Sequence, residues 1–171
     1  YKNPEANAEV FDGDWFKTGD LGRIDGEGYI HITGRKKEIY VLSGGKNVAP
    51  LVVEETMKSI PVISQVFLVG DGRKFCSALV TLDVGVILRD NLGMNPDKVP
   101  RDPMEQIEEL ERRGHKLSDF VESEEVRSDI ESQISELNKR FMNPEQIKKF
   151  TILPRDLNID SGELTPTLKI R

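Results

Sequence analysis

The sequence predicts an α+β fold, a small mixed domain of hairpins and a short sheet flanked by helices. Two hairpin signals, DGEG at residues 25–28 and Asp71-Gly72, lie between runs of alternating apolar residues. Asp-Gly turns in this setting are typical of β-hairpins. Capped helical segments occur between these hairpins, but strands and helices do not alternate strictly, as they would in a parallel α/β fold.

The amino-terminal part is expected to hold one short helix and two strand pairs. Asn3 suits the N-cap of a helix over residues 3–11, because Pro4 fits the first helical position and Glu5 favours the positive helix end. Strand pairs are expected over residues 20–24 with 28–33, and over 38–42 with 46–50.

The middle of the chain predicts a helix, a hairpin and a second helix. Pro50 is expected to open the first helix. Three apolar residues of this helix share one face: Val53, Met57 and Ile60. The hairpin covers residues 64–83, and Asp83 and Gly93 are expected to cap the helix that follows it.

The carboxy-terminal part predicts two further helices and a last strand. Asp102 suits an N-cap, with Glu105 at the capping-box position, and Gly114 suits the end of the same helix. A longer helix is expected over residues 123–142 and a strand over 148–154. The apolar stripe of the longer helix consists of Val126, Ile130, Ile134, Leu137 and Phe141.

Composition and charge argue against several classes of function. The 171 residues carry 24 basic and 30 acidic side chains, a net charge of −6, which argues against nucleic-acid binding. No run approaches the roughly 18 consecutive apolar residues of a membrane span. Cys76 is the single cysteine, and the histidines, His31 and His115, are far apart. We therefore expect no disulfide and no metal site in this chain, and a cytoplasmic location.

Three stretches hold candidate functional residues. In WFKTGDLG, Asp20 is either a turn residue bonded to its own backbone or a carboxylate offered to sugar hydroxyls. GRKKEIYVLSGGKNVAP fails the phosphate-loop pattern, which needs glycine at Tyr40 and a hydroxyl residue at Asn47. Its double glycine alone indicates a hairpin turn. In GELTPTLKIR, Lys169 belongs either to a frayed end or to a segment that brings one cation to a site elsewhere.

Taken together and in this order, the three stretches resemble the carboxy-terminal part of adenylate-forming enzymes, specifically the long-chain acyl-CoA synthetases. The resemblance begins at YKNPEANAEVF and covers essentially the whole chain. It implies an acid–thiol ligase that converts a fatty acid, ATP and CoA into acyl-CoA, AMP and pyrophosphate through an acyl-adenylate.

The resemblance also implies roles in nucleotide binding and adenylation. Asp20 matches the aspartate that binds both ribose hydroxyls of ATP and of the acyl-adenylate, and Arg35 matches the arginine that also reaches the ribose. Lys169 matches the lysine that supports adenylation. The phosphate-binding loop, the acyl tunnel and the carboxylate that holds Mg²⁺ are expected outside this chain.

A hinge and a coenzyme passage follow from the same resemblance. Lys37 matches the hinge, where many members have aspartate, and Ser43, Gly44 and Gly45 match the loop that borders the passage for the pantetheine arm of CoA. Some long-chain enzymes carry a lysine near the nucleotide where this chain has Val41, so no role is assigned there.

The resemblance divides the chain into two parts. Residues 1–34 are expected to be the end of a large amino-terminal adenylation domain, and residues 35–171 a small mobile domain whose partner is that large domain. Without the large domain, the 171-residue chain is expected to be inactive. Contact with a membrane through regions outside this chain is left open, because long-chain fatty acids partition into bilayers.

Two other functions remain open from the sequence. A fatty acyl-AMP ligase would pass the acyl group to a carrier protein instead of CoA. A non-catalytic docking module would bind partners through a small α+β domain and would leave Lys169 without a chemical role.

Overall fold

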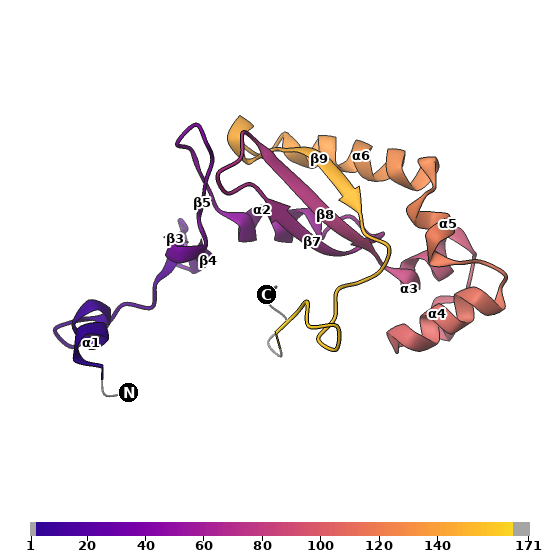
Figure 1. Ribbon diagram of the computed structural model, residues 1–171, viewed down its shortest axis with the longest axis horizontal. Coiled ribbons are helices and arrows are strands. Elements are labelled where there is room, and N and C mark those ends of the chain that lie inside the picture. The colour runs from indigo at the N-terminus through magenta and orange to yellow at the C-terminus, as the bar shows by residue number, and fades with distance from the viewer. Residues whose placement is uncertain (1–2, 166–171) are drawn as a thin grey trace.

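A three-stranded sheet forms the centre of the chain in the computed structural model, which describes residues 3–165 (Figure 1). Its strands are β7 (Ile63–Val69), β8 (Cys76–Leu82) and β9 (Ile147–Ile152), in the order β7-β8-β9. β7 and β8 are antiparallel, whereas β8 and β9 are parallel. The mixed sheet and its helices confirm the α+β class.

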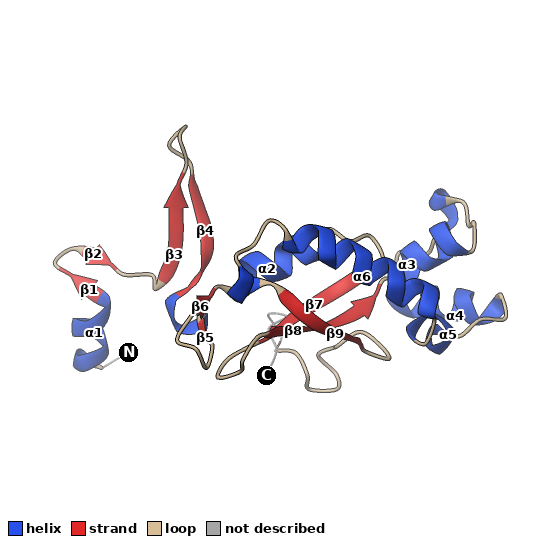
Figure 2. Cartoon of the chain, turned by 90° about the horizontal axis from the view of Figure 1, so that it is seen from above, coloured by secondary structure: helices blue, strands red, loops and turns tan. Residues whose placement is uncertain are grey.

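The predicted central hairpin is present. Phe67 pairs with Leu79 across β7 and β8, and Gly72 at the turn has φ +66°, a backbone conformation that favours glycine. Two helices, α2 (Pro50–Met57) and α6 (Glu124–Asn138), contact each other and lie on the same side of the sheet (Figure 2).

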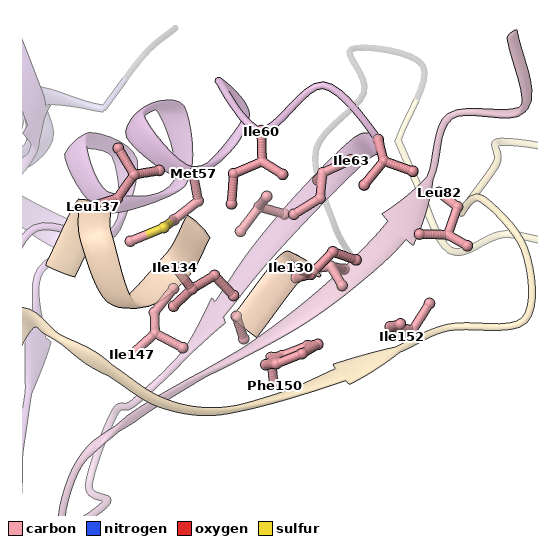
Figure 3. Packing of buried hydrophobic residues seen from close by; sticks show 14 of the residues in the cluster. Met57, Ile60, Ile63, Leu82, Ile130, Ile134, Leu137, Ile147, Phe150 and Ile152 are labelled. Atoms are coloured by element: carbon pink, nitrogen blue, oxygen red, sulfur yellow. The ribbon is translucent and has the colours of Figure 1, made fainter. Parts of the chain in front are cut away.

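The core lies between these two helices and the sheet (Figure 3). Val53, Met57 and Ile60, which were predicted to share one face of the helix that Pro50 opens, are all buried. α2 ends at Met57, however, and Ile60 lies in the turn beyond it. The longer helix ends at Asn138, four residues earlier than expected, and Phe141 packs partly buried beside the core. Burying one such isoleucine or methionine side chain stabilises the fold by about 1.5–3 kcal/mol. The other stripe residues are buried: Val126, Ile130, Ile134 and Leu137.

The helix expected over residues 84–92 is irregular. α3 (Val84–Val86) begins at Asp83, whose carboxylate accepts from the backbone nitrogen of Val86 at 3.0 Å, and a π-helical turn covers residues 87–91. The backbone nitrogen of Leu92 donates to the carbonyl oxygen of Ile87 at 3.1 Å, so the turn contains an extra residue. Ile87 and its neighbour Leu88 are both fully buried in this turn.

Two helices link this turn to α6. α4 (Pro103–Arg112) is capped as predicted, because Asp102 accepts from the backbone nitrogens of Met104 and Glu105 at 2.8 and 3.1 Å. α5 (Leu117–Val121) was not predicted. Three 3₁₀ helices complete the helical elements among residues 3–165: η1 (Lys36–Glu38), η3 (Pro96–Lys98) and η4 (Asn143–Glu145). No helix within that range is long and apolar enough to cross a membrane.

The amino-terminal segment contributes almost nothing to the core. None of residues 3–33 is buried, and Trp15 is 81% exposed. The predicted helix and hairpin are present, and a small unpredicted hairpin lies between them (Figure 2). The elements are α1 (Pro4–Val10), β1 (Phe11–Asp12), β2 (Trp15–Phe16), β3 (Asp20–Ile24) and β4 (Ile30–Arg35).

Candidate active site

Asp20 and Arg35 meet across the β3–β4 hairpin. They are direct partners in the strand register, and Nε of Arg35 lies 3.1 Å from Oδ1 of Asp20. The side chain of Asp20 is 26% exposed and that of Arg35 is 55% exposed. The Asp20 carboxylate is therefore paired with a guanidinium at a strand start.

The backbone around this pair is fixed by local bonds. The backbone nitrogen of Asp20 donates to the hydroxyl of Thr18 at 3.1 Å, and that of Lys36 donates to the carbonyl oxygen of Gly19 at 2.9 Å. An exposed ion pair contributes only about 0–1 kcal/mol to stability. A carboxylate that accepts hydrogen bonds and a guanidinium that donates them suit a ligand with neighbouring hydroxyl groups.

Lys37 lies two residues beyond Arg35, in η1. η1 follows β4 directly and leads into β5 (Tyr40–Val41), so it joins the exposed hairpin to the packed part of the chain. Lys37 lines an open cleft of about 590 Å³ between this connection and α2. Such a short connection between two strands is a suitable place for a hinge.

Two side chains that line this cleft, Glu54 and Tyr40, both bind the backbone of Leu68. The sequence analysis missed this contact. Oε1 of Glu54 accepts from the backbone nitrogen of Leu68 at 2.7 Å, and the hydroxyl of Tyr40 donates to the carbonyl oxygen of the same residue at 2.9 Å. Burial raises the pKa of the Glu54 carboxyl. Both backbone groups of Leu68, on an edge strand, are thus satisfied by side chains. One feature of the sequence could have indicated that Glu54 is partly buried. It lies between Val53 and Met57, beside the apolar face of α2.

The predicted coenzyme loop connects β5 to β6 (Asn47–Val48). The backbone nitrogen of Gly45 donates to the carbonyl oxygen of Leu42 at 2.8 Å, and Gly45 has φ +73°. Gly44 is not in this positive-φ conformation. A Cβ at either position would meet no atom within 4 Å, so both glycines face open space.

This loop is anchored on the turn of the β7–β8 hairpin. The backbone nitrogen of Ser43 donates to the carbonyl oxygen of Arg73 at 2.8 Å, and the carboxylate of Asp71 accepts from the backbone nitrogen of Val41 at 3.0 Å. Three exposed cations belong to the two joined loops, and the sequence analysis did not single them out: Lys46, Arg73 and Lys74.

The remaining candidates have simpler roles. Cys76 is fully buried, and burial raises the pKa of its thiol, so it packs as expected. The exposed His31 lies 2.6 Å from the carboxylate of Asp25. His115 is half-buried, and the centre of its ring lies 5.9 Å from that of Phe120. Among residues 3–165, no group of three or more His, Cys, Asp or Glu could hold a metal ion. Lys169 lies outside the described residues.

Comparison with known protein families gives a match over residues 37–167, to the C-terminal domain of AMP-binding enzymes. The chain belongs to this family. FadD15, a long-chain-fatty-acid–CoA ligase of Mycobacterium tuberculosis, is 38% identical over 176 aligned positions that cover 100% of this chain and 26% of FadD15. The human long-chain-fatty-acid–CoA ligase ACSBG1 is 38% identical over 161 positions, 92% of this chain and 22% of the relative. This AMP-binding C-terminal domain therefore spans about a quarter of the length of such relatives.

Solved structures share the fold of this domain. The A domain of a carboxylic acid reductase from Segniliparus rugosus, in complex with AMP and a co-purified carboxylic acid, matches 100% of this chain with 23% of its own, at a TM-score of 0.64 and 24% identity. The O-succinylbenzoate coenzyme A synthetase of Bacillus subtilis, in complex with AMP, matches 99% of this chain with 26% of its own, at a TM-score of 0.54 and 20% identity. The α+β class and the resemblance to adenylate-forming enzymes are both confirmed.

Proposed function

We propose that the chain is the carboxy-terminal part of an AMP-forming long-chain fatty acid–CoA ligase. Its similarity to such ligases supports the substrate class. The observation that carries the site assignment is the 3.1 Å pairing of Asp20 with Arg35, which places a hydrogen-bond acceptor and donors side by side. In this assignment both residues bind the ribose of ATP and later of the acyl-adenylate.

In the first half-reaction, a carboxylate oxygen of the fatty acid attacks the α-phosphorus of ATP. The bond between that phosphorus and the bridging oxygen breaks, and pyrophosphate leaves with the electron pair. Lys169, placed near the α-phosphate, stabilises the negative charge that develops there more strongly in the transition state than in the ground state. One such charge pair at about 4 Å is worth roughly 4 kcal/mol at an effective dielectric constant of 20. The magnesium ion that accompanies ATP is assigned to residues outside this chain.

In the second half-reaction, the thiolate of CoA attacks the acyl carbonyl carbon, a thioester forms and AMP leaves. Ser43, Gly44 and Gly45 border the pantetheine arm in this step. The open space around the two glycines supports this role. A rotation at Lys37 brings first Lys169 and then this loop to the reacting groups.

The amino-terminal 34 residues are proposed to belong to the large adenylation domain, and residues 35–171 to form the small domain. The exposure of apolar residues in the first segment supports this division, because such a surface marks an interface. The isolated chain would then be inactive, and micromolar ATP binding by this chain in calorimetry would contradict that inference.

Two alternatives follow from the same family. A fatty acyl-AMP ligase would perform the first half-reaction and transfer the acyl group to a carrier protein, so it would show no CoA-dependent AMP release. A non-catalytic docking module would tolerate loss of Asp20, Arg35 and Lys169 alike. The paired geometry of Asp20 and Arg35 favours a nucleotide-binding ligase over the docking module, and CoA-dependent AMP release separates the two ligases.

The experiment that tests the proposal uses the full-length ligase of which this chain would be part. We expect Lys169→Ala to lower fatty-acid-dependent ATP–pyrophosphate exchange by about 10²–10³, the cost of losing a transition-state contact. Thioester formation from preformed acyl-adenylate should continue, because Lys169 has no task in that step. Lys98→Ala, at an exposed lysine of η3, is the control and should leave both rates unchanged. Unchanged exchange in Lys169→Ala would contradict the assignment.

A further inference from the structure

The segment after β9 crosses the end of the sheet and is fastened to the opposite edge strand. The chain leaves the sheet at β9, and the backbone nitrogen of Leu153 donates to the carbonyl oxygen of Val80 in β8 at 2.8 Å. It then contacts β7, the far strand of the three. We call residues 153–165 the carboxy-terminal arm (Figure 1, yellow).

Gln65 of β7 pairs with the backbone of the arm. Its Oε1 accepts from the backbone nitrogen of Leu157 at 3.1 Å, and its Nε2 donates to the carbonyl oxygen of the same residue at 3.3 Å. One side-chain amide therefore satisfies both backbone groups of Leu157, as a neighbouring strand would. Ser64 adds a bond from its hydroxyl to Oδ2 of Asp156 at 2.9 Å. These contacts join residues 92 positions apart.

An irregularity in β7 places Ser64 and Gln65 where they meet the arm. The register between β7 and β8 shifts between Ile63 and Val66, so the two intervening residues leave the regular ladder. The backbone nitrogen of Gln65 donates instead to the hydroxyl of Thr81 at 3.1 Å. Thr81 is fully buried and is the one buried polar residue within residues 3–165. A buried hydroxyl thus stabilises the bulge whose side chains hold the arm.

Bonds within the arm connect this fastening to its end. The guanidinium of Arg155 donates to both carboxylate oxygens of Glu163, at 2.8 and 3.0 Å. The hydroxyl of Ser161 donates to the same carboxylate at 2.6 Å. Arg155 and then Ser161 lower the pKa of Glu163 to about 2, so the ion pair persists at neutral pH. Leu164 is only 4% exposed. The position of residue 164 is therefore tied to that of Gln65.

We propose that Gln65 is a positioning residue for the adenylation half-reaction: its pairing with Leu157 fixes the point from which the chain extends to Lys169. This inference rests on the proposed function. Lys169 follows Thr165 by four residues, a stretch that spans at most about 14 Å. If the arm detaches, the last fixed residue is Leu153, sixteen residues before Lys169.

The length of this tether sets the size of the effect. The effective concentration of a tethered group falls roughly as the −3/2 power of the tether length, so a fourfold longer tether lowers it about eightfold. Adenylation would decrease by that factor if the arm were fully released, and by less if the bond from Ser64 to Asp156 kept part of it in place. Thioester formation would not change, because it does not use Lys169.

The test compares Gln65→Leu with wild type in the full-length ligase. We expect hydrogen–deuterium exchange to accelerate in peptides covering residues 153–165, and ATP–pyrophosphate exchange to fall about three- to eightfold. Thioester formation from preformed acyl-adenylate should stay within twofold of wild type. Gln133→Leu is the matched control, because it removes a glutamine amide whose bond to Asp129 lies within α6. Gln65→Glu keeps the acceptor for the backbone nitrogen of Leu157 but places a carboxylate oxygen opposite the carbonyl oxygen of that residue, and should give a loss in the same direction.

Two results would overturn the inference while leaving the proposed function intact. In the first, the arm exchanges faster in Gln65→Leu but ATP–pyrophosphate exchange is unchanged, although Lys169→Ala is defective. In the second, both half-reactions fall equally, as expected of a contact that only supports folding. Unchanged exchange in Lys169→Ala would instead contradict the proposed function and, with it, a positioning role for Gln65. If Gln65→Leu does not fold, the same measurements on Gln65→Glu distinguish a positioning role from a contact that only supports folding.

Discussion

Asp20 and Arg35 show what single residues in a sequence can and cannot reveal. The motifs WFKTGDLG and GRKK indicated both residues, but their pairing depends on a register shift between Leu21 and Gly22 in β3. A one-residue change of register would place them on opposite faces of the hairpin. No local pattern encodes that shift, so the sequence singled out the two residues as candidates but did not predict their contact.

Gly44 and Gly45, in the predicted coenzyme loop, differ in backbone conformation, so we expect different effects when each is replaced by alanine. Gly45 has φ +73°, which costs an alanine about 1–2 kcal/mol, whereas Gly44 has neither a positive φ nor a neighbour within 4 Å of a Cβ. We expect Gly45→Ala to lower the free energy of unfolding by about 1 kcal/mol and Gly44→Ala to change it by less than about 0.5 kcal/mol. Chemical denaturation of both variants measures the difference.

Activity separates the two glycines further. If Gly44 borders the pantetheine passage, Gly44→Ala should slow thioester formation in the full-length ligase while ATP–pyrophosphate exchange stays at its wild-type rate. Equal stability losses in the two variants would contradict the conformational argument for Gly45. A normal thioester rate in Gly44→Ala would contradict the passage.

At the scale of elements, periodicity predicted the type of each long helix but not its ends. Four of the five residues predicted for the apolar stripe of α6 are buried in the helix, which is long enough for a 3.6-residue period to emerge, whereas Phe141 lies beyond its end. The π-helical turn at residues 87–91 was missed, because one extra residue breaks that period while both Ile87 and Leu88 are buried. The parallel pairing of β9 with β8 was also not predicted, since residues 83–146 separate the two strands and their direction is set by packing.

The contact between α2 and the edge of β7 predicts a pH dependence. Burial raises the pKa of Glu54 above its ordinary value of 4.5, so folding takes up a proton when the pH lies between the two values. Wild-type stability therefore falls as the pH rises from below the ordinary pKa through the raised one. Glu54→Gln keeps an oxygen for the backbone nitrogen of Leu68 but does not titrate. We expect the variant to gain stability relative to wild type as the pH rises above 4.5, the ordinary pKa of a glutamate.

The matched control for this element is Glu55→Gln. Glu55 is the neighbouring carboxylate, exposed and 3.0 Å from Lys58. Denaturation at several pH values should show no comparable relative gain for this variant. A flat difference between Glu54→Gln and wild type over the same range would show that burial does not govern the ionisation of Glu54.

For the whole molecule, the distribution of burial divides the chain more clearly than the sequence does. Every buried hydrophobic residue among residues 3–165 lies between Leu42 and Leu164. Residues 11–32 instead expose eight large apolar side chains: Phe11, Trp15, Phe16, Leu21, Ile24, Tyr29, Ile30 and Ile32. Composition alone did not separate these two sets, because both are apolar and both alternate with polar residues. The difference is whether the folded chain supplies a partner for them.

This division predicts that residues 35–171 fold without the segment before them. Among the described residues 3–34, deletion of residues 1–34 removes no buried side chain, and Gly34 is the one buried residue that it removes. We therefore expect the thermal midpoint to change by less than about 4 °C, which corresponds to roughly 1 kcal/mol for a chain of this size.

Solubility supplies the second readout of the same deletion. The shortened chain should also be more soluble, because the exposed apolar residues at positions 11–32 are gone. The control replaces Trp15 and Phe16 by serine in the 171-residue chain, which should improve solubility without changing the midpoint. A large loss of thermal stability on deletion would mean that the amino-terminal segment packs on the small domain, and the boundary near residue 35 would then be wrong. A preserved midpoint with improved solubility would support the proposed boundary and the proposal that a large domain covers the exposed segment.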